Sequence, residues 1–272
     1  MSIYNDFYGF REQPFNITPD PRLLFYSERH REAYNHLLFG INERKGFIQL
    51  TGEVGAGKTT LCRAFLESLG DDYTTALVLN PVMTANQLLR TVLRELGLDP
   101  PYNDRIRCYE VLNDFLLAEL EAGRDVVLLI DEAQDLSAEL LEQVRLLSNL
   151  ETDQRKLLQI VLIGQPELRD LLARDDLRQL RQRIIVRYHL GPLSPPETEH
   201  YILHRLQVAG ANSRPTLDRR ALGKIHRSSG GIPRLINVVC DKTLLCGYVE
   251  GDEHLTARHV RRAIRELGGS LE

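Results

Sequence analysis

The sequence contains the stretch Gly52-Glu53-Val54-Gly55-Ala56-Gly57-Lys58-Thr59 directly after the largely apolar run 47–51. The spacing G-x-x-x-x-G-K-[ST], between a strand-like and a helix-like segment, is the pattern of a phosphate-binding loop. Its glycines can adopt backbone angles that other residues avoid, so successive N–H groups can curl around an anion. The helix that begins at Lys58 directs the positive end of its dipole to the same place. The stretch therefore predicts a nucleotide phosphate site at a strand-to-helix turn.

Two side chains complete this predicted site. In the pattern, Lys58 reaches the β- and γ-phosphates of a nucleotide, and the Thr59 hydroxyl binds Mg²⁺. The residues expected to contact the nucleotide are Gly52, Glu53, Val54, Gly55, Ala56, Gly57, Lys58, Thr59 and Thr60. The competing interpretation is a glycine-rich turn that Lys-Thr follows by chance.

A second informative stretch is the apolar run 126–130, which is followed by Asp131 and Glu132. A continuous apolar run predicts a strand buried on both faces, which is typical of a parallel sheet covered by helices. Carboxylates at the carboxyl end of such a strand lie where open α/β sheets bind ligands. Asp131 is placed to hold Mg²⁺ through its water shell, and Glu132 to orient and deprotonate a water for attack on the γ-phosphate. The alternative is a solvated strand end.

A further buried strand is predicted over 157–163, and Gly164 and Gln165 follow it. We expect this strand to neighbour the one that precedes Asp131. The functional interpretation of Gln165 is a hydrogen bond to the attacking water or to the γ-phosphate. The alternative is a loop glutamine that bonds to nearby backbone.

The sequence predicts an α/β core followed by a helical region. Residues 1–27 are rich in aromatic residues and proline, which predicts a segment draped over the core. The core extends over 1–192, and a proline-rich boundary with a capping box falls at 191–197. Over 193–272 the periodicity predicts a small all-helical lid domain. Its four helices are expected at about 195–208, 217–228, 233–247 and 257–267.

Arginines in two segments are candidate functional residues. Arg234 lies in the first turn of a predicted helix, where the helix dipole disfavours a cation, so a nucleotide phosphate is a candidate for retaining it. Arg181 and Arg183 lie on the polar side of a predicted surface helix, just before the strand 184–190. A solvated helix face would explain these two as well.

Composition restricts the class of protein. The chain has 272 residues, of which 43% are hydrophobic and 26% charged, as in an ordinary soluble globular protein. The net charge of −4 argues against general electrostatic binding to nucleic acid or anionic membrane. No apolar run approaches the ~18 residues of a membrane span, and no signal-peptide pattern is present, so we expect a cytoplasmic protein. The four cysteines show no C-x-x-C spacing, so we expect reduced, buried thiols.

Together these motifs resemble the AAA+ superfamily of P-loop ATPases, and the resemblance covers nearly the whole chain. The stretch 52–59 looks like the Walker A loop and 128–132 like the Walker B strand. Gln165 stands at the sensor 1 position and Arg234 at the sensor 2 position. The run 180–184 is similar to the segment that carries the arginine finger. One departure is the glutamine at sensor 1, where the wider superfamily commonly has Asn or Thr.

Within the superfamily, the sequence is similar to secretion ATPases of the ExeA (general secretion pathway protein A) type. Pilus-biogenesis ATPases of the MSHA type and exosortase-associated ATPases share this pattern. The similarity rests on Tyr8-Gly9-Phe10, Thr18-Pro19-Asp20-Pro21, Asp131-Glu132-Ala133-Gln134 and Ile163-Gly164-Gln165-Pro166-Glu167-Leu168, besides the loop. Longer members continue into a membrane span and a periplasmic part, so we expect either a short member or part of a longer one.

The resemblance implies that ATP and Mg²⁺ are the cofactors. Catalysis of phosphoryl transfer rests on positioning and charge neutralisation. Lys58 and Arg234 would bind the phosphates, and Thr59 and Asp131 would hold Mg²⁺. Glu132 and Gln165 would align the attacking water. Arginine fingers of this superfamily act between subunits, with Arg183 favoured here over Arg181. The resemblance therefore implies a homo-oligomer with shared sites.

The resemblance further implies a cytoplasmic ATPase held at the inner face of the membrane by inner-membrane proteins of a secretion or pilus machine. Two alternatives stay open. One is a DNA-binding regulator of the transposition type, for which the arginine-rich stretches 178–187 and 258–265 are the candidate contacts. The other is a nucleotide-gated scaffold with weak hydrolysis.

Overall fold

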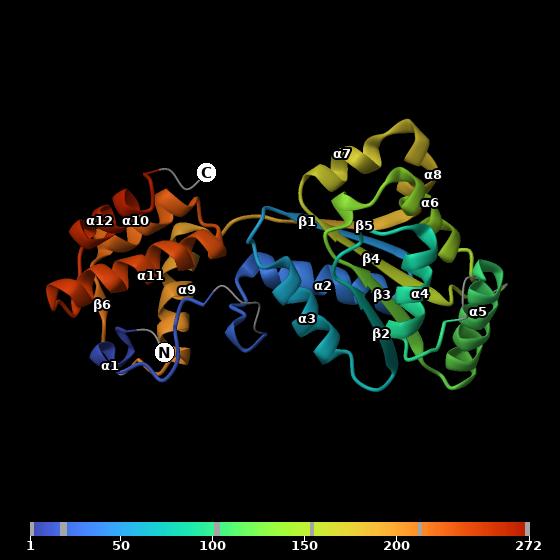
Figure 1. Cartoon of the computed structure of the whole chain (residues 1–272), viewed down its shortest axis with the longest axis horizontal. Helices are drawn as coiled ribbons and strands as arrows, with labels where there is room; N and C mark the ends of the chain where they lie inside the picture. Colours follow the sequence, from blue (N-terminus) through green and yellow to red (C-terminus); the bar gives the residue numbers. More distant parts are fainter. Residues whose placement is uncertain (1–2, 17–20, 101–103, 153–154, 212–213, 270–272) are drawn as a thin grey trace. The chain divides into compact units, whose positions relative to one another are not determined.

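Five apolar segments form the central sheet of the structure, a computed structural model that describes residues 3–16, 21–100, 104–152, 155–211 and 214–269. The strands are β1 (Phe47–Gly52), β2 (Tyr73–Val78), β3 (Asp125–Ile130), β4 (Leu158–Gly164) and β5 (Ile184–Leu190). They pair in parallel in the order β2-β3-β4-β1-β5 (Figure 1). β3 and β4 are buried along nearly their whole length, as their continuous apolar sequences predict. The predicted parallel α/β fold is confirmed.

Helices cover both faces of this sheet. On one face lie α2 (Glu28–Asn42) and α3 (Lys58–Ser68), and on the other α4 (Ala85–Glu95), α5 (Arg105–Glu121) and α6 (Ala138–Leu147) (Figure 1). Successive strand residues point to opposite faces, and Leu128 and Ile130 belong to the core on the α4–α6 face. On the other face, a Cβ added to Gly40 of α2 would lie 2.5 Å from the Cδ1 of Ile48, so the helix packs closely on β1. The remaining elements of this part are α7 (Glu167–Ala173), α8 (Arg178–Arg183) and the short turns η1 (Pro21–Leu23), η2 (Ala133–Asp135) and η3 (Asp175–Leu177).

The carboxyl ends of β1, β3 and β4 lie along one edge of the sheet. The register pairs Thr51 with Gly164, and Ile130 with Leu162. The segments that follow β3 and β4 therefore begin side by side, and the loop 52–59 begins one strand further along. The fold thus starts all three predicted motifs from a single edge of the sheet, where α/β proteins bind ligands.

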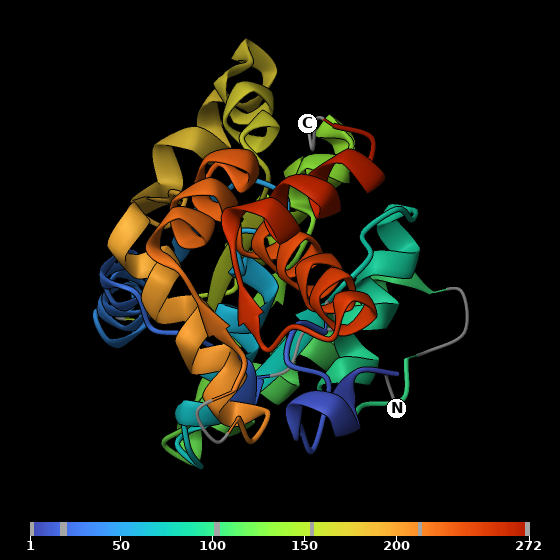
Figure 2. The same cartoon turned by 90° about the vertical axis from the view of Figure 1, so that its left-hand side faces the viewer.

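The helical region contains α9 (Pro195–Val208), α10 (Arg219–Ser229), α11 (Pro233–Glu250) and α12 (Ala257–Glu266) (Figure 2). All four lie within a few residues of their predicted bounds. The predicted capping box is present, because the Ser194 N–H donates to Oε2 of Glu197 (2.9 Å) and the Ser194 hydroxyl oxygen accepts from the Glu197 N–H. Two short parallel strands, β6 (Thr216–Leu217) and β7 (His254–Leu255), were not predicted.

The N-terminal segment, which includes α1 (Asn5–Tyr8), packs with the helical region. Its aromatic side chains Tyr4, Tyr8, Phe10 and Phe15 share one hydrophobic core with α9–α12. Buried Arg205 on α9 donates to the backbone carbonyls of Pro14 (2.7 Å) and Asn16 (2.8 Å). These contacts differ from the expected draping of 1–27 over the α/β core. The family pattern at Thr18-Pro19-Asp20 lies outside the described residues.

By their contacts the residues form two compact units. One comprises 1–30, 53–60 and 191–272, and the other comprises 31–52 and 61–190. The phosphate-binding loop therefore groups with the helical region. The proposed domain boundary at 192/193 stays a prediction.

Two expectations from composition can be compared with the structure. Among the described residues, no helix is both long enough and apolar enough to cross a membrane. The four cysteines are buried as thiols. Burial raises the pKa of the Cys240 thiol, so it stays protonated at neutral pH.

Candidate nucleotide-binding and hydrolysis site

The course of the loop after β1 depends on two glycines. Gly55 has φ +78° and Gly57 has φ +98°, a region that side chains other than glycine rarely adopt. A Cβ on Gly55 would overlap the side chain of Arg234, and one on Gly57 would lie 3.0 Å from Nε2 of His30. Both positions therefore require glycine for two reasons, the backbone angle and the closeness of a neighbouring side chain.

Lys58, the predicted phosphate ligand, is only 6% exposed. Its ammonium donates to the backbone carbonyl of Glu53 (3.0 Å), which lies within the same loop. A buried ammonium is costly unless hydrogen bonds compensate for the lost water. The structure therefore places the cation against the loop backbone at the start of α3, as the pattern requires. Its contact with a nucleotide stays a prediction.

Arg234 and the loop are in direct contact. The Arg234 N–H donates to the backbone carbonyl of Gly55 (3.2 Å), and Arg234 lies in the first turn of the 18-residue helix α11. Arg234 therefore lies against the loop, and its contact with a nucleotide phosphate stays a prediction. A cation at the positive end of a helix dipole is disfavoured unless something else stabilises it.

His30 was not singled out in the sequence, although it supports the loop. It is 3% exposed, and its Nε2 lies 3.2 Å from the carbonyl of Ala56, which accepts the hydrogen bond. Nδ1 lies 2.8 Å from the hydroxyl of Ser27, which therefore donates to it. Burial lowers the pKa of His30 below its usual value of 6.5, although the bond to Ala56 opposes that effect. A neutral ring with fixed hydrogens thus holds the loop. The only sequence signal was a Ser-x-x-His spacing at a helix start.

The carboxylates after β3 are arranged by an unusual backbone turn. Asp131 is 4% exposed, and its Oδ1 accepts the N–H of Glu132 (2.9 Å). Glu132 has φ +51° and ψ +40°, the left-handed region, which costs a non-glycine residue about 1 kcal/mol. Such strain persists where surrounding contacts impose it, often at functional sites.

Glu132 and Gln165 lie together, as predicted from the ends of neighbouring strands. The Gln165 amide donates to Oε2 of Glu132 (3.2 Å), and the Gln134 amide donates to the same oxygen (2.7 Å). The side chain of Gln165 therefore bonds to the carboxylate, and not to nearby backbone as the alternative required. Gln134, which the sequence analysis used only as part of a family pattern, is a third member of this group.

Arg181 and Arg183 lie in the last turn of α8. Arg183 donates to the hydroxyl of Ser148 (2.6 Å), and Arg181 donates to the carbonyl of Ala173 (2.6 Å). Both bonds join residues of the unit that comprises 31–52 and 61–190, and neither bond involves Glu132. An arginine finger acts on a neighbouring subunit, so its assignment stays a prediction.

The residues expected to hold a metal ion offer suitable donors. Thr59 supplies a hydroxyl oxygen, and Asp131 supplies a carboxylate with its Oδ1 already engaged by the Glu132 N–H. Mg²⁺ prefers oxygen ligands, binds through one or two protein groups and retains several waters. By its chemistry, each of these two groups therefore suits Mg²⁺, and a joint role in holding one ion stays a prediction.

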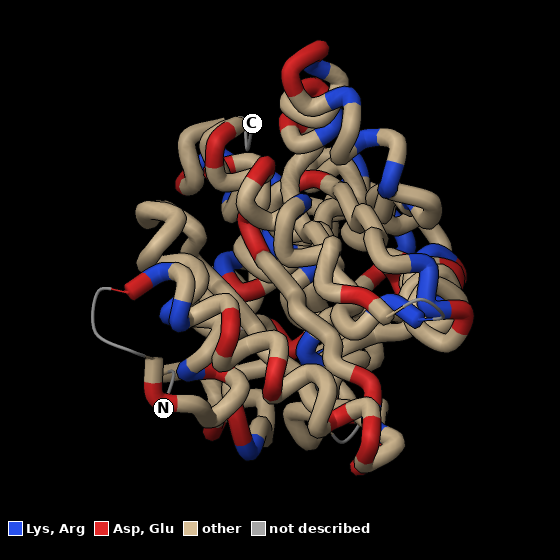
Figure 3. The backbone as a smooth tube through the Cα atoms, turned by 90° about the vertical axis from the view of Figure 1, so that its right-hand side faces the viewer, with Lys and Arg blue, Asp and Glu red and all other residues tan. Residues whose placement is uncertain are grey.

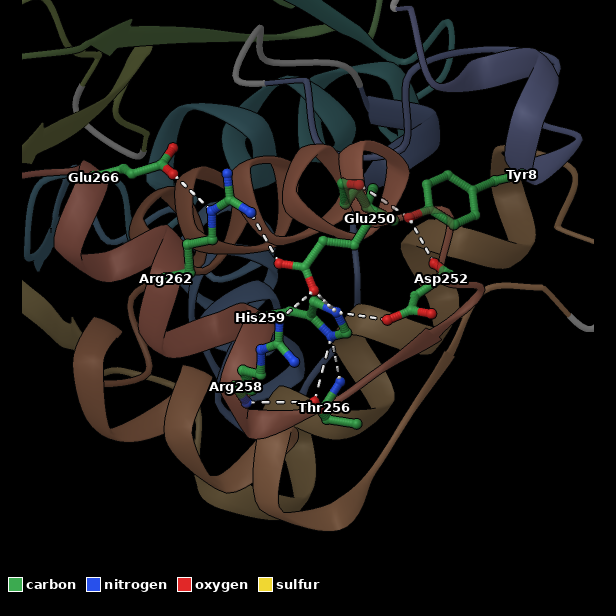
Figure 4. Close-up of polar contacts among 9 residues, drawn as sticks. Tyr8, Glu250, Asp252, Thr256, Arg258, His259, Arg262 and Glu266 are labelled. Carbon is green, nitrogen blue, oxygen red and sulfur yellow. Dashed lines mark hydrogen bonds and ion pairs between the residues drawn. The ribbon is translucent and has the colours of Figure 1, made fainter.

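A second cluster of potential metal ligands lies between α11 and α12, where Glu250, Asp252 and His259 converge (Figure 4). The Thr256 N–H donates to Nδ1 of His259 (3.0 Å), so the neutral ring carries its hydrogen on Nε2. That N–H points to Oδ2 of Asp252 (3.1 Å) and Oε2 of Glu250 (3.3 Å).

This tautomer makes the cluster a helix cap and not a good metal site. A metal ion needs the Nε2 lone pair, which the neutral ring could offer only by moving its hydrogen to Nδ1, against the Thr256 N–H. Glu250 is also paired with Arg262 (2.8 Å) and Arg258 (3.0 Å), and these partners lower the pKa of its carboxyl. The network ties the end of α11 to the start of α12.

The sheet has the strand order of an α/β AAA+ fold, with a glycine-rich loop after β1, carboxylates after β3, a glutamine after β4 and a helical region at the end. Residues 41–172 match the AAA domain family. The chain is thus an AAA domain protein. It is 46% identical over 98% of its length to general secretion pathway protein A of Aeromonas hydrophila. This homologue confirms the family that the motifs indicated, and the chain spans 49% of its length.

Solved structures with the same fold share little sequence with the chain. The Aeropyrum pernix ORC2 protein has a TM-score of 0.69 at 18% identity and covers 94% of this chain and 72% of its own. CDC6P from Pyrobaculum aerophilum has a TM-score of 0.71 at 16% identity, with coverages of 94% and 71%. The Thermotoga maritima RuvB branch migration motor has a TM-score of 0.60 at 17% identity, with coverages of 89% and 70%. At these identities the comparison shows the fold alone.

Proposed function

We propose that the chain is an Mg²⁺-dependent ATPase, which hydrolyses ATP to ADP and phosphate as a homo-oligomer. The observation that carries the proposal is the carboxylate of Glu132, which two amides hold at the carboxyl edge of the sheet. A carboxylate fixed in this way can accept a proton from water and orient that water for attack. An AAA domain supplies the phosphate-binding loop that such chemistry requires.

The proposed roles follow the chemistry of each group. Lys58 and the N–H groups of the loop bind the phosphates of ATP, and Arg234 adds positive charge from the start of α11. Glu132 deprotonates the attacking water while Gln165 fixes the carboxylate. Because phosphoryl transfer needs charge neutralisation more than covalent chemistry, these groups act chiefly by position.

Mg²⁺ is the proposed metal. Thr59 and Asp131 would hold it, the hydroxyl directly and the carboxylate through water. When bound, the ion neutralises negative charge on the phosphates.

We propose that hydrolysis supports the assembly or operation of a secretion or pilus machine, at the cytoplasmic face of the inner membrane. The 46% identity with general secretion pathway protein A supports this context. The partners would be inner-membrane proteins of that machine, because a soluble ATPase has to be recruited to the membrane where it acts.

The alternative of a DNA-binding regulator has less support. Arg258 and Arg262 in the arginine-rich stretch of α12 are both paired with Glu250, which reduces the positive charge that a phosphate backbone would meet. Acidic and basic residues are interspersed along the chain in Figure 3. Net charge −4 points the same way.

The experiment is steady-state ATPase activity against protein concentration, comparing wild type with Glu132→Gln, with and without duplex DNA. We expect specific activity to rise with concentration and to fall by at least about 100-fold in the variant. Stimulation by DNA would favour the regulator instead. Tight ATP binding without turnover at any concentration would contradict hydrolysis and favour a nucleotide-gated scaffold.

A further inference from the structure

The side chain of Gln134 links the two strand ends of the hydrolysis site. Its Nε2 donates to Oε2 of Glu132 (2.7 Å), and its Oε1 accepts the backbone N–H of Gln165 (2.9 Å). Both polar ends of one amide are therefore used, one on the segment after β3 and one on the segment after β4. Only Asn and Gln offer a donor and an acceptor in this arrangement.

The surrounding backbone is adapted to this link. A Cβ at Gly164 would lie 2.8 Å from Oε1 of Gln134, so the amide approaches β4 where there is no side chain. Glu132 lies in the left-handed region, and the η2 turn that follows it carries Gln134. A strained backbone is retained where contacts impose it. The link supplies such a contact on the carboxylate of the strained residue itself.

We infer that Gln134 is a positioning residue for the water-activating carboxylate, an inference that rests on the proposed ATPase function. Gln134 and Gln165 both donate to Oε2 of Glu132, which fixes the plane of the carboxylate. Oε1 is then the oxygen that takes the proton of the attacking water. The water oxygen forms a bond to the γ-phosphorus, and the bond from phosphorus to the bridging oxygen breaks, so that ADP leaves.

Two variants separate the two ends of the amide. Gln134→Met has similar volume and removes both hydrogen bonds. Gln134→Glu keeps an oxygen for the Gln165 N–H and replaces the donor with a carboxylate that faces Glu132. Gln143→Met, on α6, is the control for losing a partly buried glutamine elsewhere in the same unit.

Kinetics test the positioning role. We expect kcat to fall about 10- to 100-fold in both Gln134 variants, with KM for ATP within about twofold, since the side chain acts on Glu132 and not on the nucleotide. The separation of kcat from KM is the readout, because a change that only loosened the fold around the nucleotide would alter KM as well.

Hydrogen exchange tests the link without any need for activity. The backbone N–H of Gln165 should exchange about five- to tenfold faster in Gln134→Met, because this variant lacks the oxygen that accepts its hydrogen bond. In Gln134→Glu, which keeps such an oxygen, it should exchange at the wild-type rate. Wild-type kcat together with unchanged exchange in Gln134→Met would overturn the inference. Absence of turnover in the wild type would instead refute the proposed function, and the exchange rates would still show whether the link exists.

Discussion

Gly55 determines whether the loop and Arg234 can approach one another. The two residues touch so closely that a single Cβ on Gly55 would overlap the arginine side chain. We expect Gly55→Ala to lower the free energy of unfolding by about 1 kcal/mol for its backbone angle, and by about 1–3 kcal/mol more for the overlap. Affinity for ATP should fall by about tenfold or more, because the N–H groups of the loop would be displaced. Urea unfolding and nucleotide titration measure the two effects.

Gly251 provides the matched control. Its φ of +73° is close to that of Gly55 and it belongs to the same unit, but a Cβ there meets no atom within 4 Å. Gly251→Ala should show the backbone cost alone and bind ATP normally. If Gly55→Ala and Gly251→Ala lower the free energy of unfolding by the same amount, the overlap with Arg234 does not contribute to the cost of Gly55→Ala.

We expect the buried ring of His30 to make the free energy of unfolding depend on pH. Burial lowers its pKa in the folded protein below the usual 6.5, so the unfolded chain binds a proton here at higher pH than the folded chain does. Stability should therefore fall as pH drops through about 6.5. Between about pH 7.5 and about pH 5.5, we expect wild type to lose more unfolding free energy than His30→Gln, which cannot titrate but can still donate to Ala56.

Urea unfolding at the two pH values measures this difference. All other histidines are common to both proteins, so their contributions cancel. His200→Gln, at an exposed position of α9, is the control for replacing a histidine by glutamine elsewhere in the chain. If His30→Gln and wild type lose the same amount, the buried ring is not the source of the pH dependence.

At the scale of elements, hydrophobic periodicity and capping residues predicted the buried strands and the start of a helix. The continuous apolar runs of β3 and β4 indicated buried parallel strands, and the Ser194–Glu197 capping box marked the start of α9. Because neighbouring parallel strands end at one edge, the meeting of Glu132 and Gln165 could also be anticipated. The strands and the helix start could be predicted because each depends on residues close together in the sequence.

Other elements leave no such pattern. The two-residue strands β6 and β7 are too short to show an alternation. Aromatic residues near the N-terminus indicated packing but not the partner, which is the helical region. His30 and Gln134 act through contacts with residues 26 and 31 positions away, and no local spacing reports such contacts. Sequence motifs thus predicted the candidate site residues more readily than the side chains that contact them.

At the scale of the whole molecule, the arginine finger decides whether one chain can be active alone. The hydrogen bonds of Arg183 and Arg181 go to Ser148 and Ala173 of their own unit. Both bonds lie within one chain and do not by themselves identify a finger, whose proposed role is to reach the nucleotide of a neighbouring subunit. Heterologous contacts of this kind generate rings or filaments.

Mixing two inactive proteins tests this role. Glu132→Gln lacks the water-activating group but keeps the finger, whereas Arg183→Ala lacks the finger but keeps that group. In a random 1:1 mixture, about a quarter of the interfaces would combine an intact Glu132 with an intact Arg183 from the next subunit. We expect Glu132→Gln alone to be at least about 100-fold slower than wild type and Arg183→Ala alone at least about 10³-fold slower, and the mixture to recover up to about a quarter of wild-type activity. Arg181→Ala, mixed in the same way, is the parallel case. A mixture no more active than its components would show that Arg183 acts within its own chain or not at all, and recovery only with Arg181→Ala would move the finger to Arg181.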